Sequence, residues 1–150
     1  MEELSTIPTP CTTKIQALRD SIAQIIVGQT QATDLLLTSV IARGHVLIEG
    51  VPGVAKTLLA RVMAQLIDAR FSRVQFTPDL MPSDVLGTTV YNMKTGDFDF
   101  HPGPVFADVV LADEINRAPA KTQAALFEVM EERQVTVDGT PRAMSDVFTI

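Results

Sequence analysis

The sequence predicts an α/β domain in which a central parallel sheet lies between two layers of helices. Short apolar runs at residues 45–49, 73–76 and 109–112 are typical of buried strands, because such strands need no polar face. Longer segments between these runs carry apolar residues at helical spacing. Strands that alternate with helices pack as parallel β/α units. The chain has 150 residues, 46% of them apolar, which is enough for one domain with its own core.

The spacing of apolar residues predicts four main helices, at 13–26, 30–42, 56–69 and 119–133. Gly28 separates the first two helices. Pro119 opens the last one, where its missing N–H would have no intrahelical partner. On this last helix we expect four residues to face the core, namely Ala120, Ala124, Phe127 and Met130.

Two β-hairpins are expected outside the central sheet, at residues 88–101 and 134–143. The turn signals are residues 94–97 in the first hairpin, and Asp138 with Gly139 in the second. Residues 1–11 are expected to be a loose leader ahead of a domain at 12–150. The chain stops at residues 148–150, which look like the opening of another strand, so we expect a fragment of a longer protein.

Charge and composition narrow the classes of function. The formal net charge of −6 argues against a protein that wraps nucleic acid or binds an anionic membrane surface. A single cysteine, Cys11, cannot form an intramolecular disulfide, and the first residues lack the basic and apolar regions of a signal peptide. No run of about 18 apolar residues occurs that could span a membrane. We therefore expect a cytoplasmic protein, with nucleic acid an unlikely partner.

A phosphate-binding loop is predicted between the first strand and the third helix. The pattern G-x-x-x-x-G-K-[ST] is nearly matched by Gly50, Val51, Pro52, Gly53, Val54, Ala55, Lys56 and Thr57. Small residues let successive backbone N–H groups point at phosphate oxygens, and the N-terminus of the following helix adds its positive dipole end. Lys56 would contact the β- and γ-phosphates, and the Thr57 hydroxyl would bind Mg²⁺. Ala55 departs from the pattern, which has glycine there.

An acidic pair follows the apolar strand at 109–112. Asp113 and Glu114 stand where a parallel strand opens onto the ligand crevice, at its carboxyl end. Asp113 would hold Mg²⁺, mostly through water. Glu114 would orient and deprotonate the attacking water, a role that a protein which only binds nucleotide does not require. The two residues therefore predict ATP hydrolysis as well as ATP binding.

These residues together resemble the AAA+ class of P-loop NTPases and, within it, the MoxR-type ATPases. The resemblance covers about residues 20–150 and is carried by the segments 49–57, 76–84, 102–107 and 113–119. Alanine is normal at position 55 in that family. The stretch at 26–29 is similar to one that touches adenine in this class, which implies a binding role for Val27, Gly28 and Gln29. Leu58, directly after the loop, is a further candidate.

The resemblance implies a three-layer αβα core and a hexameric ring that acts as a chaperone in metal insertion and in the maturation of protein complexes. A von Willebrand factor A-type protein is an implied partner. The two hairpins would be insertions that face the ring channel or a substrate. The sensor residues, the arginine finger and the C-terminal lid are absent from this chain by the same comparison. We therefore expect the isolated chain to bind nucleotide weakly and to hydrolyse it poorly.

Three other functions stay open at this point. A non-hydrolysing module, in which ATP only gates assembly, is disfavoured by an intact Glu114. A magnesium-chelatase-like or DNA-remodelling ring ATPase shares the layout, and the acidic charge disfavours DNA only mildly. A small-molecule kinase would need an acceptor pocket and a lid, which the adjacent acidic pair and the hairpins do not suggest.

Overall fold

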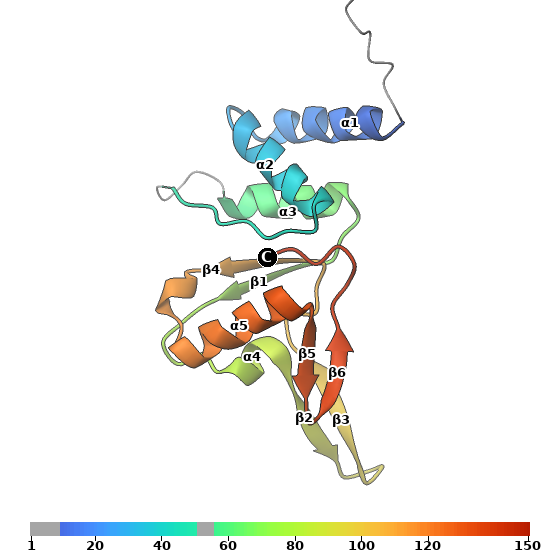
Figure 1. Ribbon diagram of the computed structural model, residues 1–150, viewed down its shortest axis with the longest axis vertical. Coiled ribbons are helices and arrows are strands. Elements are labelled where there is room, and N and C mark those ends of the chain that lie inside the picture. Colours follow the sequence, from blue (N-terminus) through green and yellow to red (C-terminus); the bar gives the residue numbers. More distant parts are fainter. Residues whose placement is uncertain (1–9, 51–55) are drawn as a thin grey trace, which may run out of the picture.

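The protein is described by a computed structural model for residues 10–50 and 56–150 (Figure 1). Its helices are α1 (Pro10–Ile25), α2 (Thr30–Ile41), α3 (Lys56–Leu66), α4 (Pro82–Leu86) and α5 (Ala120–Glu132), with a 3₁₀ turn at Ile115–Arg117. Its strands are β1 (Phe71–Gln75), β2 (Gly87–Asn92), β3 (Asp97–Pro102), β4 (Val109–Asp113), β5 (Gln134–Val137) and β6 (Thr140–Ala143). No helix in these two ranges is long and apolar enough to cross a membrane.

A parallel sheet forms the centre of the domain. Strands β1 and β4 pair in parallel, with Gln75 opposite Asp113 at their carboxyl ends. The sheet continues on the other side of β4, where Thr149 forms a parallel bridge with Val109. The backbone N–H of Val46 then donates to the carbonyl of Ile150 at 2.9 Å. The spatial order is therefore β1, β4, residues 148–150 and the segment 45–49, which leads into the phosphate loop.

The segment 45–49 differs from its prediction as a buried strand. It adopts no regular strand structure, and Leu47 is 79% exposed. The physical reason is the lack of a ladder, because a strand is defined by successive hydrogen-bonded backbone pairs. Among the described residues, 148–150 reach this segment through one backbone–backbone bond, from Val46 to Ile150. The apolar run is thus present, but its burial and pairing are incomplete in the described chain.

Two hydrophobic cores lie on opposite faces of the sheet, as expected for three layers. Adjacent residues of β4 point to opposite faces, so Val109 packs in the core formed with α1, α2 and α3, and Val110 packs in the core under α5. Figure 1 shows α1, α2 and α3 on one side of β1 and β4, with α4 and α5 on the other. The predicted αβα arrangement is confirmed.

Helix α5 buries a different face from the one predicted. Its buried residues are Thr122, Leu126 and Val129, whereas Phe127 is 54% exposed. The Thr122 hydroxyl donates to the carbonyl of Leu80 at 2.7 Å, which turns this face toward α4. The spacing of apolar residues in α5 is compatible with burial of either face, because Leu126 and Phe127 are adjacent and both apolar.

Both predicted hairpins form, and they lie side by side in Figure 1. In the second hairpin, Asp138 and Gly139 both have positive φ, 51° and 75°, as a two-residue hairpin turn of the primed type requires. The guanidinium of Arg142 on β6 lies 3.9 Å from the centre of the Phe100 ring on β3. This cation–π contact joins the two hairpins.

Candidate functional site

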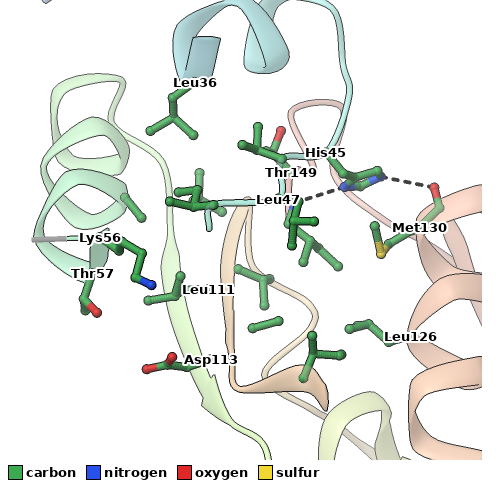
Figure 2. Close-up of a pocket in the computed structure, with 18 of the residues that line it drawn as sticks. Leu36, His45, Leu47, Lys56, Thr57, Leu111, Asp113, Leu126, Met130 and Thr149 are labelled. Carbon is green, nitrogen blue, oxygen red and sulfur yellow. Dashed lines mark hydrogen bonds between the residues drawn. The ribbon is translucent and has the colours of Figure 1, made fainter. Parts of the chain in front are cut away.

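The N-terminus of α3 and the carboxyl end of β4 meet at one cavity of about 770 Å³. Lys56 and Thr57 open α3, and Asp113 closes β4, with Glu114 directly after it. All four line the cavity. Figure 2 shows Lys56, Thr57 and Asp113 together at one end of it. Its volume lies within the range of small-molecule and cofactor sites.

The remaining predicted nucleotide-binding residues are of two kinds. Val51, Pro52, Gly53, Val54 and Ala55 fall outside the described residues. Of the described candidates, Gly50, Leu58, Val27, Gly28 and Gln29 do not line the cavity.

The connection between α1 and α2 carries the stretch expected to touch adenine. Gly28 has a φ of 81°, which ends α1 and lets the chain turn into α2. Val27 beside it is 89% exposed, so an apolar side chain is left open to a planar ligand such as a base. The assignment of this connection to adenine binding stays a prediction.

Lys56 lies back against its own loop. Its Nζ donates to the carbonyl of Gly50 at 2.9 Å. This contact joins Lys56 to Gly50, the first residue of the predicted phosphate loop. The backbone N–H groups of such a loop are expected to point at phosphate oxygens. An ammonium has three donors, and among the described residues the Gly50 carbonyl takes one of them.

Asp113 is held by an arginine from the neighbouring strand. The Arg73 guanidinium donates to Oδ2 of Asp113 at 2.6 Å and to the side-chain oxygen of Gln75 at 3.1 Å. Gln75 stands opposite Asp113 in the β1–β4 register, and Arg73, two residues earlier, projects from the same face. Sequence reasoning missed Arg73, although polar residues alternating with Val74 in a predicted strand were a signal for it.

Glu114 occupies an unusual backbone conformation. Its φ of 55° and ψ of 43° are left-handed, a region that costs a non-glycine residue of the order of 1 kcal/mol. The carboxylate accepts a hydrogen bond from Arg117 Nη1 at 2.9 Å across the 3₁₀ turn. The turn thus bends the chain away from β4 directly after Asp113, and the Glu114 side chain, which lines the cavity, pairs with Arg117 across it.

The donor set fits a nucleotide-bound magnesium ion better than a metal held by protein alone. Within the described ranges, no three His, Cys, Asp or Glu side chains gather as a metal site. Mg²⁺ usually keeps several waters and is bound through one or two protein oxygens plus substrate phosphates. The Thr57 hydroxyl and the Asp113 carboxylate, on the same cavity as Lys56, supply this set.

Comparisons with known proteins agree with this chemistry. The family described as "ATPase family associated with various cellular activities (AAA)" matches residues 45–150. Chaperone MoxR1 of Mycobacterium tuberculosis is 50% identical over 129 residues, which cover 86% of this chain and 34% of MoxR1. The uncharacterised protein YeaC of Bacillus subtilis is 50% identical over 131 residues, which cover 87% of this chain and 41% of YeaC.

A solved structure gives the same result for the fold. A crystal structure from Cytophaga hutchinsonii, provisionally described as an ATPase, superposes with a TM-score of 0.81 at 46% identity. The match covers 91% of this chain and 42% of that one. The chain therefore spans about two fifths or less of the length of these relatives.

Proposed function

This chain belongs to the AAA family of ATPases, as a member of MoxR type, and from this premise we propose that it binds Mg-ATP in the cavity between α3 and β4 and hydrolyses it. One observation carries the proposal: Lys56, Thr57, Asp113 and Glu114, separated by up to 58 positions in sequence, line the same cavity. Cation, hydroxyl and carboxylates are the groups that phosphoryl transfer to water needs.

Each residue has a distinct role in this proposal. Lys56 binds the β- and γ-phosphates, and Thr57 with Asp113 holds Mg²⁺. The ion, when bound, neutralises the negative charge that builds up on the phosphate oxygens. Glu114 accepts a proton from the attacking water and orients it. Arg117 donates to one oxygen of this carboxylate at 2.9 Å, which leaves the other oxygen to accept the proton of the attacking water.

The wider role that we propose is that of a cytoplasmic chaperone. The name of MoxR1 supports an ATPase with a chaperone-like role. We propose that subunits assemble into a hexameric ring, that hydrolysis moves one subunit against the next, and that this motion assists the maturation of partner proteins, including metal insertion. A von Willebrand factor A-type protein is the partner we expect.

The test uses two substitutions with opposite signatures. Lys56→Ala should weaken Mg-ATP binding by about 10- to 100-fold, as expected for loss of a charged hydrogen bond to phosphate. Glu114→Gln should bind ATP as the wild type does and lose about 10²- to 10⁴-fold in turnover. Unchanged affinity in Lys56→Ala would refute the phosphate site. If Glu114→Gln loses binding instead, Glu114 is structural, and a module gated by nucleotide occupancy becomes the better account.

Ring assembly has its own measurement. Turnover per subunit is measured across a wide range of protein concentrations, for this chain and for the longer protein that we expect to contain it. Turnover that rises with concentration in the longer protein indicates sites completed between subunits. Equal turnover by the two forms would contradict the expectation that the 150-residue chain alone is poorly active.

A further inference from the structure

His45 connects three segments that are distant in sequence. Its Nδ1 accepts the backbone N–H of Ile150 at 3.0 Å, and its Nε2 lies 3.2 Å from the carbonyl of Met130 in the last turn of α5. The Phe148 ring packs against the imidazole edge to face, with centroids 5.6 Å apart. Figure 2 shows both hydrogen bonds, which extend from opposite sides of the ring.

Only one form of the imidazole satisfies both partners. A neutral ring has one donor and one acceptor nitrogen, so Nε2 must carry the proton toward Met130 and Nδ1 must be bare toward Ile150. The protonated ring has two N–H groups. Its Nδ1–H would then face the N–H of Ile150, donor against donor, and the hydrogen bond would be lost.

Two hydrogen bonds of Ile150, to Val46 and to His45, hold the segment 45–49 against residues 148–150, and we call this pair of bonds the clamp. The Ile150 carbonyl accepts from the backbone N–H of Val46, and the Ile150 N–H donates to the His45 ring. Both backbone groups of Ile150 are therefore bonded to the adjacent residues 45 and 46. Thr149 beside it is tied to β4, because its carbonyl accepts from Val110 and its N–H donates to Asp108, each at 2.9 Å. The segment 45–49 is thereby linked, through residues 149 and 150, to β4.

We propose that His45 is a positioning residue that holds the phosphate-loop segment in register with β4 while the imidazole is neutral, and that its protonation releases this segment and weakens nucleotide binding. Among the described residues, the bonds of Ile150 to Val46 and to His45 link the segment 45–49 to residues 148–150. The part of the proposal that concerns nucleotide rests on the proposed function. The part that concerns the clamp does not.

The electrostatic surroundings favour the neutral ring. Burial lowers the pKa of His45 below its ordinary value of 6.5, the hydrogen bond to the Met130 carbonyl raises it, and the charge of Arg133 lowers it further. Arg133, at the end of α5, is the charged residue that acts on the ring, and the side chains of Met130, Phe148 and Ile150 are uncharged. Because the folded pKa is depressed, the stabilisation is present above pH 6.5 and is lost as pH falls below it.

The test compares three variants of the full-length protein. His45→Gln keeps an acceptor and a donor but cannot titrate. His45→Phe keeps the ring packed against Phe148 but has no hydrogen bonds. His101→Gln removes the other histidine, which is exposed at the end of β3. For each protein, urea unfolding and the Mg-ATP dissociation constant are measured at pH 7.5 and pH 5.5.

The wild type and His101→Gln should lose stability at pH 5.5 and should bind Mg-ATP about 3- to 10-fold more weakly than at pH 7.5, a change equivalent to losing one hydrogen bond. The titration of ATP itself is common to all the proteins and cancels in the comparison. His45→Gln should lose this extra pH dependence. His45→Phe should bind weakly at both pH values.

Three results would count against parts of this account. If His45→Gln keeps the wild-type pH dependence of unfolding, the clamp is refuted. A second result is that His45→Gln loses the pH dependence of unfolding, but His45→Phe and wild type have the same Mg-ATP dissociation constant. His45 then stabilises the fold without positioning the loop. If the wild type binds no Mg-ATP at either pH, the proposed function fails, and the unfolding data alone then decide the clamp.

Discussion

Arg73 donates a 2.6 Å hydrogen bond to Oδ2 of Asp113, the carboxylate that we propose to hold Mg²⁺. Both side chains are partly exposed, 46% for Arg73 and 34% for Asp113, so the pair can open at little cost. The guanidinium occupies Oδ2, one of the two carboxylate oxygens through which a hydrated cation could be held.

Replacement of Arg73 by alanine should make Mg²⁺ binding easier. An exposed ion pair contributes about 0.5–1 kcal/mol, so the Mg²⁺ concentration for half-maximal ATP binding should fall by about 2- to 5-fold. The measurement is an Mg²⁺ titration at fixed ATP. Arg43→Ala is the matched control, because Arg43 contacts Asp146 at 3.9 Å, where both side chains are largely exposed. A higher Mg²⁺ requirement in Arg73→Ala would mean that Arg73 orients Asp113 rather than competing for it.

The ion pair between Arg70 and Asp108 should stabilise the fold in a pH-dependent manner. Hydrogen bonds from the Arg70 side chain lower the pKa of Asp108 to about 2, against an ordinary value of 3.8. Because the folded pKa is depressed, the stabilisation is complete above pH 3.8 and is lost as pH falls toward 2. After allowance for the 70% exposure of Arg70, the contribution is about 1–2 kcal/mol.

This contribution is measured by urea unfolding of wild type and Asp108→Asn between pH 2 and pH 6. The difference in unfolding free energy should be largest at pH 6 and should shrink toward pH 2. Asp97→Asn, on the exposed hairpin strand β3, is the control that removes a carboxylate elsewhere. A constant difference between wild type and Asp108→Asn across this range would show that the carboxylate charge is not what matters.

Much of the fold could be predicted because its determinants are local. Apolar spacing predicted α2, α3 and α5 to within a few residues, and the Asp138–Gly139 turn fixed the second hairpin. The place of the acidic pair at the end of a strand was also predictable, because Asp113 and Glu114 directly follow the apolar run at 109–112. Lys56, Thr57, Asp113 and Glu114 line one cavity, and their roles in a nucleotide site stay a prediction.

What could not be predicted depends on contacts between distant segments. The buried face of α5 is chosen by the Thr122–Leu80 hydrogen bond, which periodicity does not contain. The segment 45–49 has the composition of a strand, but pairing depends on its neighbours rather than on its residues. Arg73 becomes a partner of Asp113 only through the β1–β4 register. The two bonds of His45 likewise join residues 85 and 105 positions away.

The base of the first hairpin should not tolerate a side chain at Gly103. A Cβ there would lie 2.3 Å from the Val85 carbonyl oxygen and 2.4 Å from the Gly87 nitrogen, so backbone must move. Gly103→Ala should lower the unfolding free energy by about 1–3 kcal/mol, as overpacking does. In the control Gly44→Ala, the nearest atom to the new Cβ is the Ser39 oxygen at 3.7 Å, an ordinary contact. Equal stability of the two variants in urea unfolding would contradict this packing.

Thr122 should contribute to stability through its hydroxyl rather than its methyl group. The side chain is 1% exposed, and its Oγ1 donates to the Leu80 carbonyl at 2.7 Å, so the bond links α5 to the segment before α4. Thr122→Val keeps the shape but leaves that carbonyl without this donor, which should cost about 1–3 kcal/mol. Thr136→Val, the same change at an exposed position of β5, should alter stability by less than about 0.5 kcal/mol.

Thermal or urea unfolding of the two valine variants gives the comparison directly, and Thr122→Ser, which keeps the hydroxyl, should recover most of the loss. The methyl group that serine lacks is worth about 1 kcal/mol of burial, so recovery should be incomplete. If Thr122→Val matches wild type while Thr122→Ser is destabilised, the methyl group is the stabilising part. The register of α5 would then be set by apolar packing of Leu126 and Val129 alone.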